Sequence, residues 1–279
     1  MKKHIFTVSA FIIASFLIVA ACSKEDSKQA ELMLEKNEYT ECSNPNNAYD
    51  SAGFLHNYYL QEMYDDNIFN IGTVRILSSE DVDVWLHDHS SYLEKYNVDV
   101  ISFAEIYNSF QNSSNNLYWG FIDGLDMTNE SKSNIKSMIG GVIDIFLNTG
   151  SWNYDLYYDY ITSEEERIME SQFYSSEESQ KELREVLSFA SILRYSLFYW
   201  TNTGNMKKAD GKGPGTWGII IADAAFGLVS LNFGVAALAS GLATWGAVAN
   251  GDITIEKNDD GGYTVSPTDS EDNDGSEDN

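Results

Sequence analysis

Apolar positions recur three and four residues apart through most of residues 49–203. Clear stripes are Phe103, Ile106, Tyr107 and Phe110; Ile135, Met138, Ile139, Val142 and Phe146; and Leu183, Val186, Leu187, Ala190, Leu193 and Leu197. This spacing places apolar side chains on one face of a helix, whereas a strand would alternate every second residue. The sequence therefore predicts a mainly α fold, with a domain of roughly five to seven amphipathic helices over residues 49–203.

Three places in this domain carry helix-start signals. Ser102 with Glu105, and Ser163 with Glu166, have the spacing of a capping box, in which the two side chains satisfy free backbone amides of the first helical turn. Asp50 precedes another helical stripe, and aspartate is a favoured residue at the start of a helix. We expect a helix to begin at each of these places.

An apolar segment rich in small residues occupies residues 217–250. Its residues 224–249 comprise 26 residues without a charge, which is long enough to cross a bilayer as a helix. Gly227, Gly234 and Gly241 recur every seven residues, and small residues four apart let helix backbones approach closely. The segment is predicted to be helical, with these glycines at helix-packing or membrane-contact positions.

Three interpretations of residues 217–250 stay open: insertion into a membrane, a buried pair of close-packed helices, and an assembly region that awaits a partner. The glycine pattern resembles the glycine-rich tails of small pore-forming bacteriocins, which implies insertion. Asp223 favours a helix start, because a carboxylate is costly in the middle of a bilayer. The expected partner of this segment is accordingly an envelope protein or a target membrane.

Composition changes on both sides of this segment. Residues 204–216 form a linker rich in glycine and lysine. Residues 251–266 contain alternating β-forming residues around a glycine turn, which predicts a small β-hairpin. Residues 267–279 are acidic and poor in apolar residues, so they are predicted to be a disordered tail.

The N-terminal residues have the pattern of an export signal. Lys2 and Lys3 precede an uncharged, mostly apolar run at residues 5–21. A charged start, a short apolar run and small residues before a cleavage site are typical of a secretory signal. The run is shorter than the about 20 residues of a transmembrane helix. Residues 1–21 are therefore predicted to be a signal peptide that is removed.

Val19-Ala20-Ala21-Cys22 ends this signal and resembles the lipobox of bacterial lipoproteins. The resemblance implies cleavage before Cys22 and acylation of its thiol, for example with palmitate, so that the lipid holds the protein on a membrane. Ser23-Lys24-Glu25-Asp26 resembles the export tag of surface-exposed lipoproteins of the Bacteroidota, which implies an outer-membrane, surface-exposed location. A solvated tether is the alternative for this motif. Residues 22–48 are polar and are predicted to be a flexible tether ending in turn-forming asparagines.

The chain is strongly acidic. Its formal charge is −26, and removal of residues 1–21 makes it −28, because the signal contains two lysines and no acidic residue. Such a field repels nucleic acid at long range. A nucleic-acid partner is therefore excluded. If Cys22 carries lipid, Cys42 has no disulfide partner within the chain, so stability must come from the core.

Four polar residues of the helical domain form a candidate structural or functional cluster: Asp50, His56, Asn57 and Arg194. His56 falls on an apolar stripe, which favours a hydrogen-bonded core histidine over a binding or catalytic site. Arg194 lies beside the stripe of its own helix and is expected to pair with a carboxylate such as Asp50. A surface hydrolase would need a cleft that converges on Asp50, His56 and Arg194.

The sequence around this cluster carries a second resemblance. Tyr49-Asp50, Gly53 and His56-Asn57 resemble a pattern of Bacteroidota envelope proteins of uncharacterised function. This resemblance covers short patches of the chain and implies no particular activity.

Metal and catalytic motifs are absent from the sequence. His87 and His89 would point about 200° apart on a helix, which is a poor arrangement for one metal ion. No phosphate loop, dinucleotide fingerprint, nucleophile elbow or zinc-protease helix is present. We therefore expect no metal, cofactor or catalysis. The leading interpretation is a non-catalytic surface protein that binds or assembles with other components, and the alternative is a bacteriocin-like protein that inserts residues 217–250 into a target bilayer.

Overall fold

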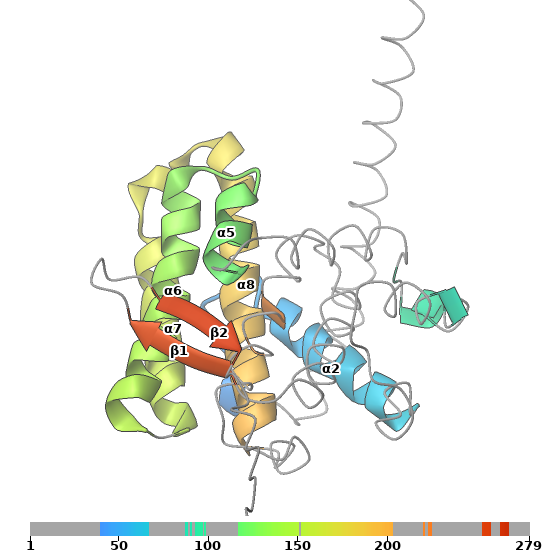
Figure 1. Cartoon of the computed structure of the whole chain (residues 1–279). Helices are drawn as coiled ribbons and strands as arrows, with labels where there is room; N and C mark the ends of the chain where they lie inside the picture. Colours follow the sequence, from blue (N-terminus) through green and yellow to red (C-terminus); the bar gives the residue numbers. More distant parts are fainter. Residues whose placement is uncertain are drawn as a thin grey trace, which may run out of the picture. The chain divides into compact units, whose positions relative to one another are not determined.

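The structure is a computed structural model of the 279-residue chain (Figure 1). It describes residues 40–66, 87, 88, 90, 93–96, 98, 117–150, 152–202, 220, 223, 224, 253–257 and 263–267. The chain divides into two compact units, residues 1–43 and 44–279, and each is described by itself. In the first unit the described residues include the 3-10 turn η1, Thr40–Cys42, in which Cys42 is buried.

The described core of the second unit is mainly α-helical, which confirms the fold class predicted from the periodicity. Its five α-helices are α2 (Ser51–Asp65), α5 (Leu117–Gly124), α6 (Asn129–Thr149), α7 (Tyr154–Met169) and α8 (Glu177–Asn202). Two 3-10 turns accompany them, η2 (Glu94–Tyr96) and η3 (Gln172–Ser175).

Helix α8 is the centre of this unit. It packs against α2, α6, α7 and η3, while α5 packs against α6. All of residues 185–200 are buried, so α8 is enclosed on every side over this stretch. The expectation that each helix buries a single face is therefore wrong for α8, because it has neighbours all round. Its polar side chains consequently enter the interior, where they need hydrogen-bond partners.

Helix α6 has a start that depends on α8. Thr128 caps it by accepting a hydrogen bond from Ser131 N at 3.4 Å. Glu182 of α8 accepts hydrogen bonds from Thr128 N at 3.0 Å and from the Ser131 hydroxyl at 2.5 Å. Burial acts to raise the pKa of Glu182, but the hydrogen bonds from Ser131 and Thr128 outweigh burial and lower it. The start of α6 is thus fixed from a neighbouring helix.

The capping box predicted at Ser163 and Glu166 is wrong. Helix α7 begins earlier, after Asn153, whose side chain accepts a hydrogen bond from Asp155 N at 3.2 Å. Ser163 lies inside α7 and donates to the carbonyl of Tyr160 at 2.7 Å. A serine inside a helix can bond to a preceding carbonyl in this way, so the Ser-x-x-Glu spacing alone does not identify a helix start. The other capping box, at residues 102–105, lies outside the described residues.

Two short strands are described near the C-terminus. β1 (Ile253–Lys257) and β2 (Tyr263–Pro267) pair antiparallel, with Ile255 opposite Val265. They fall where the sequence predicted a hairpin at residues 251–266. The tail that follows Pro267 lies outside the described residues.

Most of the apolar segment at residues 217–250 also lies outside the described residues, including Gly227, Gly234 and Gly241. The signal peptide, Cys22 and the linker at residues 204–216 lie outside them as well. Within the part of the chain that the structure describes, no helix has both the length and the apolar character needed to cross a bilayer.

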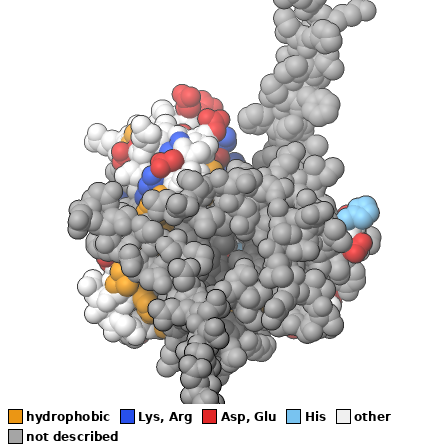
Figure 2. All heavy atoms as spheres, viewed as in Figure 1, with side chains coloured by type: hydrophobic (Ala, Val, Ile, Leu, Met, Phe, Trp, Pro, Cys, Tyr) orange, Lys and Arg blue, Asp and Glu red, His pale blue; other side chains and the backbone are white. Residues whose placement is uncertain are grey.

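The described surface carries charges of both signs close together (Figure 2). Lys136 pairs with Asp123 at 2.6 Å, and Arg167 pairs with Glu164 at 2.7 Å. Exposed pairs of this kind contribute little to stability, typically under about 1 kcal/mol each. The core around α8 must therefore supply most of the stability of the described part.

Candidate functional site

The loop before α2 folds into the helical unit. Asn47 N donates to the Asn44 carbonyl at 3.0 Å, and the side chains of Asn44 and Asn47 accept from Asn46 N at 3.1 Å and from Tyr49 N at 2.8 Å. The predicted turn chemistry is confirmed. Asn44 and Asn47 are nevertheless buried, so the predicted flexible tether of residues 22–48 is wrong from Asn44 onward. Their amides are held in the interior by a carboxylate.

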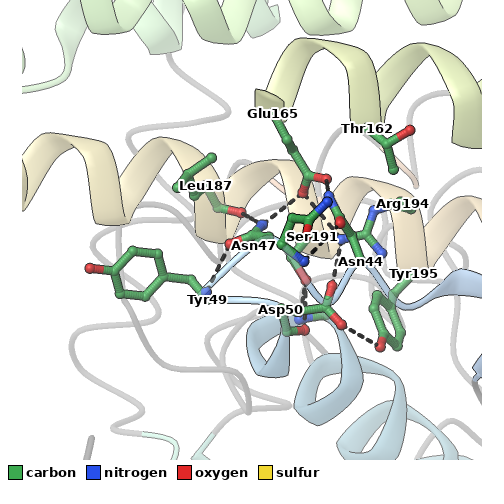
Figure 3. Close-up of polar contacts among 12 residues, drawn as sticks. Asn44, Asn47, Tyr49, Asp50, Thr162, Glu165, Leu187, Ser191, Arg194 and Tyr195 are labelled. Atoms are coloured by element: carbon green, nitrogen blue, oxygen red, sulfur yellow. Dashed lines mark hydrogen bonds and ion pairs between the residues drawn. The ribbon is translucent and has the colours of Figure 1, made fainter. Parts of the chain in front are cut away.

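That carboxylate belongs to Glu165 of α7, which is fully buried (Figure 3). Asn44 donates to its Oε2 at 2.6 Å, and Asn47 donates to its Oε1 at 2.7 Å. Asn47 also donates to the carbonyl of Leu187 in α8 at 3.0 Å. The two asparagines therefore join the N-terminal loop to two helices.

Arg194 of α8 is fully buried between two carboxylates (Figure 3). Its Nη2 lies 2.5 Å from Asp50 Oδ1 and 3.1 Å from Glu165 Oε1. Burial alone would lower the pKa of Arg194, but the charges of Glu165 and Asp50 outweigh it and raise the pKa above its usual value. The pairing of Arg194 with Asp50 that the sequence suggested is present, and the guanidinium stays charged.

Asp50 does not cap α2 as predicted. It stands at the N-cap position, but its side chain makes no capping hydrogen bond. Its carboxylate instead faces Arg194 and accepts a hydrogen bond from the Tyr195 hydroxyl at 3.1 Å. Pairing with a buried cation therefore takes precedence over capping.

Helices α2 and α8 approach closely at Gly53. Ser191 Oγ accepts from Gly53 N at 3.0 Å and donates to the Asp50 carbonyl at 2.8 Å. A Cβ at position 53 would lie 2.4 Å from Tyr195 Cδ2 and 2.5 Å from the Ser191 carbonyl oxygen. Only glycine fits this crossing without movement of the α8 backbone.

His56 and Asn57 lie on the same interface and are both fully buried. Asn57 Nδ2 donates to the Tyr195 carbonyl at 2.8 Å, and its Oδ1 lies 2.9 Å from His56 Nδ1. Burial lowers the pKa of His56 to about 4, although the hydrogen bond with Asn57 acts to raise it. The interpretation of His56 as a hydrogen-bonded core residue is confirmed, and the ring is neutral at pH 7.

A short segment from the beginning of the apolar region contacts these helices. We call it the docked segment: Ile220, Asp223 and Ala224, which are helical and fully buried. Asp223 Oδ2 accepts hydrogen bonds from the Ser196 hydroxyl and from Trp200 Nε1, the latter at 3.3 Å. The same oxygen lies 3.8 Å from His56 Nε2. Asp223 therefore lies in a folded interior.

The predicted cluster separates into two polar groups on one α2–α8 interface. Asp50 and Arg194 belong to a network with Glu165, while His56 and Asn57 belong to a group with Asp223. Glu165 and Asp223 were not among the predicted site residues. Glu165 could have been found, because it occupies the apolar stripe formed by Tyr157, Ile161 and Ile168 in α7. A carboxylate on such a stripe requires a buried partner.

Among the described residues, the polar side chains of this interface bind one another. In the described ranges, no three histidine, cysteine, aspartate or glutamate side chains are placed to hold a metal. His87, which the sequence analysis considered as a metal ligand, is exposed, and His89 lies outside the described residues. Chemically, this interface compensates buried charge. It also joins five parts of the chain, which are helices α2, α7 and α8, the loop at residues 44–50 and the docked segment.

Comparisons with protein-family models, curated proteins and solved structures found no match to this chain. Its function is therefore inferred from its own residues and contacts.

Proposed function

We propose that this chain is a lipoprotein held in the outer membrane by a lipid on Cys22 and exposed at the cell surface. Its helical ectodomain binds or assembles with envelope or extracellular components and catalyses no reaction. Residues 217–250 form a helical segment that packs into the resting fold, and residues 251–266 form a small hairpin at its end. The lipobox Val19-Ala20-Ala21-Cys22 supports the anchor.

One observation supports the non-catalytic role above others. The ionisable side chains of the predicted cluster face the interior, since Arg194 and His56 are each fully buried and Asp50 pairs with Arg194. A general acid or base must come within hydrogen-bond reach of the proton that it transfers. Groups enclosed in this way stabilise the fold and leave the surface to bind partners.

The anchor is tested by metabolic labelling with palmitate. The wild-type chain should be labelled and shortened by the length of residues 1–21, whereas Cys22→Ala should be unlabelled and unprocessed. Cys42→Ala is the matched control and should label as the wild type does. Label that persists in Cys22→Ala would contradict the anchor.

Surface display is tested on intact cells by external protease. The wild-type protein should be degraded from outside. Replacement of Lys24, Glu25 and Asp26 by alanine should leave the lipid in place but protect the protein from protease. Equal degradation of both proteins would show that this motif serves only as a tether.

A second candidate function is insertion of residues 217–250 into a target bilayer. The uncharged length of residues 224–249 favours it. Dye-filled vesicles should leak with residues 23–279 but not with the same chain lacking residues 225–249, which retains Asp223 and the docked segment. No leakage with either chain would exclude insertion under those conditions and favour packing within the fold.

A further inference from the structure

Exposed apolar side chains gather at one end of the α6–α7 pair. Of the three large apolar side chains that are exposed among the described residues, two lie there. Leu147 belongs to the last turn of α6 and is 45% exposed, and Leu156 belongs to the first turn of α7 and is 41% exposed. Only residues 150–153 separate the two helices, and hydrophobic atoms are visible on the described surface at this end (Figure 2). We call residues 145–156 the apolar tip.

The apolar tip differs in charge from the rest of the chain. Residues 145–154 contain no charged side chain, although the whole chain has a formal charge of −26. The nearest charges along the sequence are Asp144 and Asp155, one on either side. A strongly acidic protein is repelled by negative head groups, and a charge that enters the head-group layer loses water. An uncharged end avoids both costs when it meets a lipid surface.

The two helix ends of the apolar tip are closed by hydrogen bonds. Gly150 has a left-handed conformation, with φ 59°, and its N donates to the Phe146 carbonyl at 2.7 Å. On the other side of the turn, the Asn153 side chain accepts from Asp155 N at 3.2 Å. Free amides and carbonyls at helix ends are costly to bring into lipid. These hydrogen bonds lower that cost.

The residue types at the surface of the tip favour lipid over a protein partner. The Trp152 ring lies 4.8 Å from that of Phe146 and 6.3 Å from that of Tyr157, between centroids, and its Nε1 is buried. These aromatic rings pack on one another, so leucines are the large apolar side chains that the tip exposes. Leucine is under-represented among the residues that dominate protein interfaces. Aliphatic side chains do enter the boundary between lipid head groups and acyl chains.

We propose that the apolar tip rests on the surface of the bilayer, with Leu147 and Leu156 inserted below the lipid head groups. The flanking aspartates limit its depth, because a carboxylate is costly below the head groups. Two leucines are too few to anchor the protein, so the contact fixes which way the ectodomain faces. The proposal rests on the proposed lipid on Cys22, which raises the effective concentration of the tip at the membrane, so that a weak contact is populated.

The test holds the protein on a membrane without using Cys22. Residues 23–279 carry an N-terminal hexahistidine tag and bind phosphatidylcholine vesicles that contain nickel-chelating lipid. A fluorophore is attached either to Asn148→Cys in the tip or to Ser175→Cys in η3, because both positions are exposed. Cys42 is buried and should not react, which labelling of the unsubstituted chain checks.

Spin-labelled lipid added to these vesicles should quench the fluorophore at position 148 strongly and the one at position 175 weakly. The physical reason is that only the tip enters the layer in which the spin labels lie. Equal quenching at the two positions would overturn the proposal and leave a protein as the partner of the tip. Because the tag replaces the natural anchor, this outcome is independent of the palmitate labelling that tests the proposed function.

A double variant distinguishes insertion of the leucines from mere proximity to the membrane. Leu147→Glu and Leu156→Glu should each lower the ratio of bound to unbound tip on the order of tenfold, and together on the order of 100-fold. Quenching at position 148 should then fall to the level at position 175. Quenching that persists in the double variant would overturn the proposal. Should this variant not fold, the comparison of the two positions in the unaltered tip still decides.

Phe173→Glu is the matched control for the double variant. Phe173 is the third exposed large apolar side chain of the described residues, at 39%, but it lies in η3 between the exposed acids Glu170 and Glu177. Its replacement should leave quenching at position 148 unchanged. Loss of quenching in this control as well would mean that added negative charge alone repels the protein from the vesicle, and it would overturn the assignment of the contact to the tip.

Discussion

Arg194 carries a full charge although its side chain is fully buried. The carboxylates of Asp50 and Glu165 pair with it directly, and the amides of Asn44 and Asn47 bind Glu165 in turn. A buried ion pair adds little over a well-packed apolar core, but removal of one partner leaves a charge that nothing compensates. At the scale of single residues, each charged member of this network therefore needs the others to be present if the protein is to fold stably.

Replacement of Arg194 by leucine should lower the free energy of unfolding by about 3–5 kcal/mol, because Asp50 and Glu165 would be left without their cation. Urea unfolding followed by circular dichroism measures this loss. The matched control is Lys136→Leu, which removes an exposed pair with Asp123 and should cost under about 1 kcal/mol. Equal losses in the two variants would show that burial adds nothing to the importance of Arg194.

At the scale of helices, the crossing of α2 and α8 depends on the absence of one side chain. Gly53 brings its backbone against Ser191 and Tyr195, and the hydrogen bond from Gly53 N to Ser191 forms at this contact. Backbone on the opposite helix cannot move aside as the end of a flexible side chain can. This crossing brings α2 and α8 close enough for the Arg194 network and the His56–Asn57 group to form between them.

Gly53→Ala should therefore destabilise the protein by about 1–3 kcal/mol through overpacking. Gly124→Ala is the control, since a Cβ there meets no atom within 4 Å, and it should be neutral or slightly stabilising. Thermal unfolding of both variants measures the difference. If Gly53→Ala behaves like Gly124→Ala, the close approach is not a constraint on the fold.

Sequence periodicity was sufficient for the helical class and for the inward position of His56, because both follow from local spacing. It also suggested the Arg194–Asp50 pair. The stripe of α7 marks Glu165 as a buried carboxylate, but it does not identify Arg194 as its partner, since a contact between residues 29 apart leaves no local pattern. The sequence also did not indicate that Asn44 is buried. Its polar surroundings predicted a tether, whereas its amide binds the buried carboxylate of Glu165.

At the scale of the whole molecule, the formal charge of −26 acts against compactness. Added sodium chloride should raise the melting temperature, because the screening length shortens from about 30 Å at 0.01 M to about 8 Å at 0.15 M. Differential scanning calorimetry measures the shift, and an uncharged osmolyte at equal osmolarity is the control. A melting temperature that falls with salt would show that attractive pairs outweigh the repulsion.

The central position of α8 has a consequence for the order in which the chain can fold. Helix α2 packs against α8, and the hydrogen bond between Asn57 and Tyr195 joins residues 138 positions apart. A polypeptide that emerges from its N-terminus, from a ribosome or across a membrane, must present more than half of its length before α2 can cover its apolar face. Such distant contacts slow folding. The early helices therefore stay open to chaperones, and to proteases, until α8 arrives.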